Sequence, residues 1–111
     1  MCAVQATLAV GDVLYLSDTV THLSQKKVMR WCVVVLVTGY HVRVVGRSAS
    51  CHRGVFTPAG ALPEFDKDGL FWPASARISL ADAMRARNIG KLPERYLGDV
   101  LAQFRRRRRK T

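Results

Sequence analysis

The chain has 111 residues, which is enough for one domain that buries roughly two thirds of the surface of its unfolded chain. With 49% hydrophobic and 23% charged residues it has the composition of a globular protein, so wholesale disorder and a bundle of membrane helices are both excluded. The formal charge of +10 favours a polyanionic partner, of which nucleic acid is the leading class.

Strands dominate the first half of the chain. Residues 10–17 alternate between apolar and polar, and residues 29–37 form a continuous β-branched run, which predicts an outer and a central strand. A polar loop over residues 18–28 separates them. A tight turn follows the second strand, and the chain returns as its hairpin partner. Arg30 and Ser48 are therefore expected at similar heights on adjacent strands.

The second half is less regular until its end. Glycine, proline and aspartate are frequent between residues 50 and 69, as in loops. Short strands are expected over residues 55–57, 69–72 and 76–80. Residues 79–88 fit either a strand or a helix, because Ser79 and Asp82 have a spacing like that of a capping box.

The chain ends in an amphipathic helix. Pro93 suits the first helical position and Glu94 suits the positive end of the helix dipole. The apolar residues that follow share one face: Leu97, Val100, Leu101 and Phe104. We therefore expect one domain over residues 1–104, a small barrel of the mainly β or α+β class with a C-terminal helix. Residues 105–111 form a basic tail, either a frayed helix end or a disordered arm.

A long basic stretch without any acidic residue runs from Thr19 to Pro63. Its cations are Lys26, Lys27, Arg30, Arg43, Arg47 and Arg53. From this stretch we expect RNA contacts by Lys26, Lys27, Arg47 and Arg53, together with the hydroxyl of Ser50. The terminal arginine run either adds affinity for RNA without sequence choice or raises solubility.

Three residue types in and near this stretch suit phosphodiester chemistry. Arg30 can clamp two phosphate oxygens and stabilise a phosphorane-like transition state, or it can be a solvated strand-end arginine. Ser48 and Ser50 can donate to a phosphate or simply form a turn. His22, in the basic loop, can act as acid or base, whereas His52 and His41 are expected in a loop and a hairpin.

Other site classes lack the residues they need. The three cysteines make no disulfide framework, and cysteine and histidine spacing matches no paired zinc-ligand pattern, so no metal and no cofactor are expected. No Gly-rich phosphate loop or nucleophile elbow is present. Neither a membrane span nor a secretion signal is apparent, which places the protein in the cytoplasm. Of Tyr15, Trp31, Tyr40 and Trp72, about one is expected to face RNA, since aromatic residues prefer burial.

The order of several short motifs resembles the PemK/MazF family, the toxins of bacterial type II toxin–antitoxin systems. The motifs are Gly11-Asp12-Val13, Arg30-Trp31 before Val33-Val34-Val35, Ser48-Ala49-Ser50, Gly69-Leu70 and Ile89-Gly90-Lys91-Leu92. The resemblance covers nearly all of residues 10–104. It departs from the family where Trp31 replaces a usual proline. It also departs at residues 72–74, where some members carry an acidic partner for the catalytic arginine.

The resemblance implies an SH3-like barrel, often a homodimer, that cleaves single-stranded RNA without metal and leaves a cyclic phosphate and a free 5′-hydroxyl. A cognate antitoxin protein would cover the RNA groove. Carried over by motif, Arg30 is the catalytic arginine, Ser48 stands where the family usually has threonine, and His22 lies in a loop where some members have a histidine. The alternative is an inactive barrel of the same kind that binds nucleic acid or a protein partner through its basic face.

Overall fold

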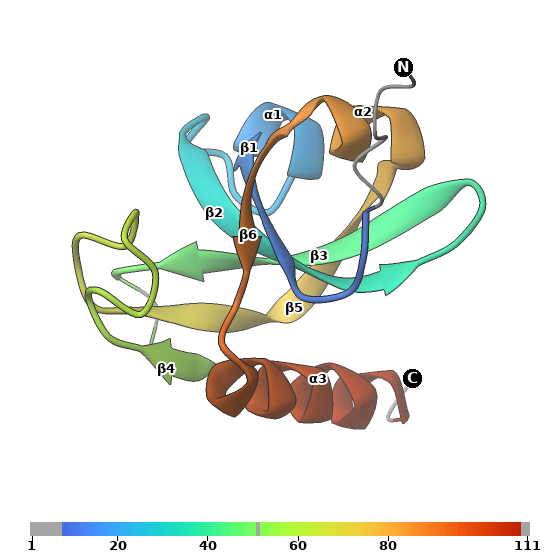
Figure 1. The fold of residues 1–111 in the computed structure, drawn as a ribbon. Coiled ribbons are helices and arrows are strands. Elements are labelled where there is room, and N and C mark those ends of the chain that lie inside the picture. Colours follow the sequence, from blue (N-terminus) through green and yellow to red (C-terminus); the bar gives the residue numbers. More distant parts are fainter. Residues whose placement is uncertain (1–7, 51, 110–111) are drawn as a thin grey trace, which may run out of the picture.

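The computed structural model describes residues 8–50 and 52–109, which form a small, mainly β fold closed by a C-terminal helix (Figure 1). The elements are β1 (Asp12–Ser17), α1 (Asp18–Thr21), β2 (Met29–Val37), β3 (His41–Ser48), β4 (Val55–Thr57), β5 (Gly69–Ser79), α2 (Leu80–Arg85), β6 (Arg87–Lys91) and α3 (Glu94–Arg109). The predicted fold class is confirmed. Among the described residues, no helix is long and apolar enough to cross a membrane.

All six strands belong to one antiparallel sheet in the order β4-β5-β3-β2-β1-β6, which curls into a half-barrel. The predicted hairpin of β2 and β3 is present and pairs Cys32 with Gly46. On the other side of β2, Arg30 pairs with Leu16 of β1. Both faces of β2 are also buried, with Val33 and Val35 in one hydrophobic core and Cys32 and Val34 in another, which explains its continuous apolar run.

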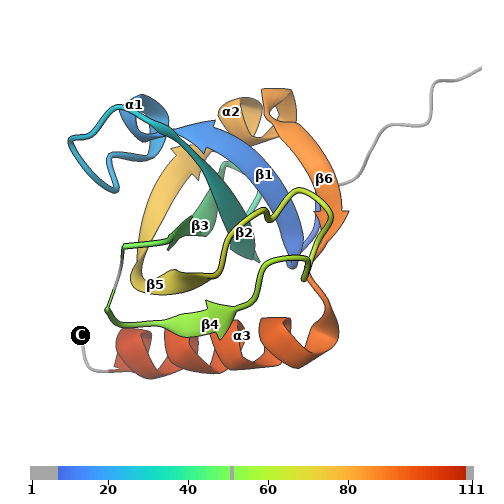
Figure 2. The same cartoon turned by 90° about the vertical axis from the view of Figure 1, so that its left-hand side faces the viewer.

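The two faces of the sheet carry separate hydrophobic cores. In Figures 1 and 2, α3 lies across one side of the sheet, and α1 and α2 lie on the other. On the α3 side, Val33, Val45 and Phe71 pack with Val100 and Phe104 of the helix. The opposite core consists of Leu14, Leu16, Cys32, Val34, Val42, Val44, Ile78 and Ala83. Alternate strand residues therefore point into different cores, which fixes the register of each strand.

β5 is one strand of 11 residues, where the sequence suggested two short ones. Pro73 does not end it, because the pairs Val45↔Ser75 and Arg47↔Phe71 place residues 72–74 opposite Gly46 alone. Such a bulge leaves backbone positions outside the ladder, and proline is tolerated there.

Residues 79–88 contain both elements between which the sequence left a choice. Ser79 ends β5 and caps α2, since its hydroxyl accepts from the Asp82 amide at 3.0 Å. The helix stops at Arg85, and Arg87 starts β6, which pairs with β1. The capping signal was correct, but it governs only the first six residues that follow it.

The expected terminal helix is present and longer than predicted. Pro93 immediately precedes α3, and its carbonyl accepts from the Leu97 amide at 3.0 Å. Residues 105–109 continue the helix, so a disordered arm is wrong for them, whereas residues 110–111 lie outside the described residues. Arginine is a good helix former and its charge favours the C-terminal end of the helix dipole, which accounts for the extension.

Candidate functional site

One pocket of about 410 Å³ gathers most of the residue types that phosphodiester chemistry requires. It is lined by Ser24, Lys26, Arg30, Ser48, Ser50, His52, Arg53 and Trp72. These residues come from the α1–β2 loop, from β2, β3 and β5, and from the chain after β3. Three cations, one imidazole, three hydroxyls and one indole thus meet, and the described lining residues include no carboxylate.

The sheet register brings Arg30 and Ser48 to the same pocket, as the hairpin pattern predicted. Cys32 pairs with Gly46 in this antiparallel hairpin, so Arg30, two residues before Cys32, comes level with Ser48, two residues after Gly46. Gly46 also makes room for Arg30. A Cβ there would lie 2.9 Å from Leu23 Cδ1 and 3.6 Å from Arg30 Cδ. A larger side chain at residue 46 would therefore displace the groups that shape this end of the pocket.

Asp18 and Ser24 hold Arg30 in place. The Arg30 Nε donates to Asp18 Oδ1 at 2.8 Å, and its Nη2 donates to Ser24 Oγ at 3.1 Å. Ser24 Oγ in turn donates to Asp18 Oδ2 at 2.6 Å, which closes a ring of three side chains. The Arg30 and Asp18 side chains are only 9% and 1% exposed. Their orientation is thus fixed by buried, charge-assisted hydrogen bonds.

Asp18 is an acidic neighbour of Arg30 that the sequence motifs did not predict. It lies on α1, where the Ser17 hydroxyl caps the helix by accepting from the Thr19 amide at 3.1 Å. Burial alone raises the pKa of Asp18, but hydrogen bonds from Arg30 and Ser24 and the charge of Arg30 lower that pKa below its ordinary value. Asp18 is therefore a carboxylate that orients Arg30 from behind the pocket wall.

Ser48 and Ser50 form a turn, which was the alternative to a binding role, and they also face the pocket. Their hydroxyl oxygens lie 3.2 Å apart, and the Ser50 amide donates to Ser48 Oγ at 3.2 Å. Such a local side-chain to backbone bond is typical of serine at the end of a strand. Ser48 is half-buried and Ser50 is exposed, so both hydroxyls remain within reach of a ligand.

Arg47 was expected to contact RNA, but the structure buries it in the fold. Its Nε donates to Thr57 Oγ1 at 2.7 Å, and its Nη2 donates to the carbonyl oxygens of Thr57 at 2.9 Å and Lys67 at 2.6 Å. The guanidinium carbon lies 4.0 Å from the centroid of the Phe65 ring. Burial lowers the pKa of Arg47, which is 9% exposed. Arg47 thus joins β4 to the loop before β5, and these contacts favour a structural role over the predicted RNA contact.

Two further predicted site residues lie outside the pocket. His22 is an exposed residue that ends α1 with a positive φ of 57°, and Lys27 is exposed with the same φ. Neither lines the pocket, whereas the predicted Lys26, Arg53 and Ser50 do. The imidazole in the pocket belongs to His52, which follows the predicted serine pair by only two residues. That proximity was the available signal for His52 in the sequence.

One of the four candidate aromatic residues lies at the site. Trp72 lines the pocket, while the rings of Tyr15 and Trp31 pack on each other with centroids 4.2 Å apart. Tyr40 is 88% exposed at the hairpin turn. Trp72 reaches the pocket through the pairing of β5 with β3, a long-range contact that the sequence did not predict.

The pocket combines what is needed to hold a phosphate, to move a proton and to stack a base. Cations and hydroxyls can bind phosphate oxygens, the His52 imidazole can serve as a general acid or base, and the Trp72 indole can stack on an unpaired base. No protein-family model matches the chain and no curated protein matches it, so the resemblance to PemK/MazF toxins stays a prediction.

Proposed function

We propose that the protein is a metal-independent endoribonuclease that cleaves single-stranded RNA in the pocket around Arg30. The observation that carries the proposal is the meeting of Arg30 with Lys26, Arg53, His52 and three serine hydroxyls in one pocket. In the cell it would act in the cytoplasm as the toxin of a type II toxin–antitoxin system, as the resemblance implies.

The cations of the pocket would bind the scissile phosphate. Among residues 8–50 and 52–109, the bonds of Arg30 to Asp18 and Ser24 use Nε and Nη2, so its Nη1 can donate to a ligand. Lys26 and Arg53 add positive charge from two different loops. The Arg30 charge, held in position by Asp18 and Ser24 before RNA arrives, would stabilise the additional negative charge of a phosphorane-like transition state.

The proposed reaction is an internal transfer at phosphorus. The 2′-oxygen of the RNA attacks the adjacent phosphorus while His52 takes the proton of the 2′-hydroxyl. The bond from phosphorus to the 5′-oxygen breaks, and that oxygen gains a proton from solvent. The products are a 2′,3′-cyclic phosphate and a free 5′-hydroxyl, and no metal is needed to balance the step.

The same pocket suits control by an acidic protein segment. A cationic, open depression attracts carboxylates as well as phosphates, so a segment of the cognate antitoxin would compete with RNA there. A homodimer belongs to the same proposal, because the family implied by the resemblance is often dimeric.

A second function, RNA binding without cleavage, is favoured by the ion pair behind the pocket. Asp18 compensates much of the charge of Arg30, and both side chains are almost fully buried. A charge so compensated stabilises a dianionic transition state less than an unpaired one would. An inactive barrel would keep the affinity of the pocket for RNA and lack the chemistry.

The test compares two histidine variants in the presence of EDTA. The purified protein is incubated with a long unstructured RNA, and the cut sites and end groups are mapped. We expect His52→Ala to lower the cleavage rate by roughly 10²- to 10⁴-fold, as loss of a general base does. His22→Ala is the matched control and should cleave normally. Arg30→Lys keeps a cation beside Asp18 and should cleave slowly without unfolding.

Three results decide between the candidates. Discrete cuts with cyclic-phosphate ends that depend on His52 support the endoribonuclease. RNA that is bound but stays intact refutes cleavage and favours the second function. Cleavage that disappears in His22→Ala and persists in His52→Ala would contradict the assignment of the proton-transfer group.

A further inference from the structure

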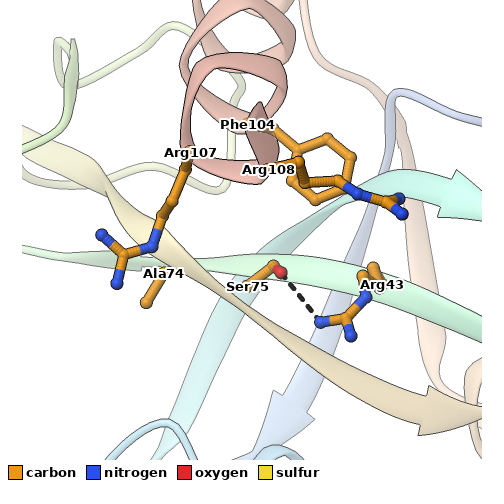
Figure 3. Close-up of a pocket in the computed structure, with 6 residues that line it drawn as sticks. All are labelled: Arg43, Ala74, Ser75, Phe104, Arg107 and Arg108. Carbon is orange, nitrogen blue, oxygen red and sulfur yellow. Dashed lines mark hydrogen bonds between the residues drawn. The ribbon is translucent and has the colours of Figure 1, made fainter. Parts of the chain in front are cut away.

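A second cationic pocket lies where the end of α3 meets β3 and β5 (Figure 3). It has a volume of about 350 Å³ and is lined by Arg43, Ala74, Ser75, Phe104, Arg107 and Arg108. In Figure 3, Arg107 and Arg108 leave the helix on two sides and flank Ser75, and Arg43 reaches Ser75 from β3. The described lining residues supply three guanidinium groups and no carboxylate.

Neighbouring side chains hold two of these arginines. Arg43 Nη1 donates to Ser75 Oγ at 3.1 Å, and the guanidinium of Arg108 lies 5.6 Å from the centroid of the Phe104 ring. Phe104 is itself buried in the core on the α3 side. Arg43 and Arg108 are thus held against the folded domain.

β5 connects this pocket to the one around Arg30. Trp72 lines the Arg30 pocket, Pro73 lines a small depression with Arg106 and Arg107, and Ser75 lines the arginine pocket. Trp72 and Ser75 are three residues apart, so the chain between them spans at most about 10 Å. Past Phe71, no described strand pairs with the outer edge of β5. The bulge at residues 72–74, where Pro73 lies beside Arg106 and Arg107, thus separates the two pockets along β5.

We propose that the pocket of Arg43, Arg107 and Arg108 binds the backbone phosphates that flank the cleaved bond on the same single-stranded RNA. This inference rests on the proposed function, since it takes that RNA as the ligand. Guanidinium groups bind phosphodiesters well. Small single-strand-binding barrels cover roughly 4 to 16 nucleotides, a length of RNA that exceeds the separation of at most about 10 Å between Trp72 and Ser75. The second pocket would lengthen the bound RNA and leave the chemistry to the first.

The test measures RNA affinity as a function of salt. The ligand is a 2′-O-methyl oligonucleotide of about 12 nucleotides, which cannot be cleaved, and a dinucleotide of the same chemistry serves as the short probe. The variant is Arg43→Gln/Arg107→Gln/Arg108→Gln. The charge-matched control is Arg85→Gln/Arg87→Gln/Arg95→Gln, whose residues are exposed and belong to α2, β6 and the first turn of α3.

We expect the pocket variant to bind the long RNA roughly tenfold more weakly at low salt, with a salt slope reduced by about 0.7 for each phosphate that the arginines no longer neutralise. Dinucleotide binding should change little, and so should the affinity of the control for the long RNA. Arg107→Gln/Arg108→Gln alone, at two exposed positions, should show the same effect in part, which guards against misfolding through Arg43.

The failures are distinguishable. Equal losses in the pocket variant and the control would reduce the effect to net charge and overturn the inference. Unchanged affinity in the pocket variant, with RNA still bound through Lys26, would overturn it and leave the proposed function intact. Polyglutamate serves as the probe for acidic proteins. If the pocket variant loses as much affinity for polyglutamate as for the long RNA, the pocket is assigned to acidic proteins instead. If the wild-type protein binds no RNA at all, the proposed function itself fails.

Discussion

Replacing Arg47 by alanine should destabilise the fold and so separate a structural arginine from an RNA-binding one. The side chain donates three hydrogen bonds, at 2.7, 2.9 and 2.6 Å. The two bonds to Thr57 are fully buried, and Thr57 has no exposed surface. Arg47→Ala removes the guanidinium donors from both acceptors on Thr57 and opens a space beside Phe65.

The expected decrease in stability follows from these contacts. Each buried acceptor left without a partner costs about 1–3 kcal/mol, and the weaker packing on Phe65 adds to the cost of the two acceptors of Thr57. Part of this loss is offset, because folding of the variant no longer requires the guanidinium to be desolvated. The balance is a decrease of about 2–5 kcal/mol in the free energy of unfolding, the range expected when a buried hydrogen-bond network is broken. That is a large share of a typical total of about 5–15 kcal/mol.

The assay is urea unfolding followed by tryptophan fluorescence and circular dichroism, alongside RNA binding. Arg47→Lys should be destabilised less, because one ammonium keeps the charge but does not span the acceptors on Thr57 and Lys67. Lys26→Ala is the control and should bind RNA more weakly without loss of stability, since Lys26 is exposed at the pocket. A stable Arg47→Ala variant with weakened RNA binding would refute the structural role.

Three more outcomes are expected. The fold lowers the pKa of Asp18 below 3.8, so the ionised carboxylate stabilises the protein above that pH, and this stabilisation is lost as the pH falls through the lower, folded-state pKa. The free energy of unfolding should therefore change less with acid pH in Asp18→Asn than in the wild-type protein. Burial raises the pKa of Cys32 to about 12, so at mildly alkaline pH iodoacetamide should label it only after unfolding, as read by peptide mass spectrometry. Gly54→Ala should lower the free energy of unfolding by more than about 2 kcal/mol, because Gly54 has a φ of +132° and an added Cβ would lie 2.0 Å from the Phe71 carbonyl oxygen. Gly39→Ala is the control and should change the free energy of unfolding little, because a Cβ there would meet open space.

Each of these has a clear contrary result. Parallel acid titration curves would mean that Asp18 gains nothing from its partners in the folded state. Rapid labelling of native Cys32 would contradict its burial. Equal stabilities of the two glycine variants would mean that the backbone at Gly54 adapts without cost.

The sequence predicted the local elements well and the long-range contacts poorly. The β2–β3 hairpin, and with it the shared position of Arg30 and Ser48, follows from patterns within a few residues of the turn. The contact between Arg30 and Asp18 joins residues 12 positions apart and depends on how β1 pairs with β2. The length of β5 was also missed, because a proline within a strand is compatible with a bulge, and a bulge has no signal in a single sequence.

Arg30 and Arg47 show why charge alone does not identify a binding residue. Both arginines border a valine-rich strand in the basic stretch, and both were candidates on that ground. Arg30 meets Asp18 and still lines a pocket, whereas Arg47 is covered by Phe65 and bound to the backbone at Lys67. Phe65 and Lys67 both come from the loop between β4 and β5, far along the chain from Arg47. The role of each arginine is therefore set by the path of distant loops, so the decisive experiments are those that measure stability and RNA affinity on the same variants.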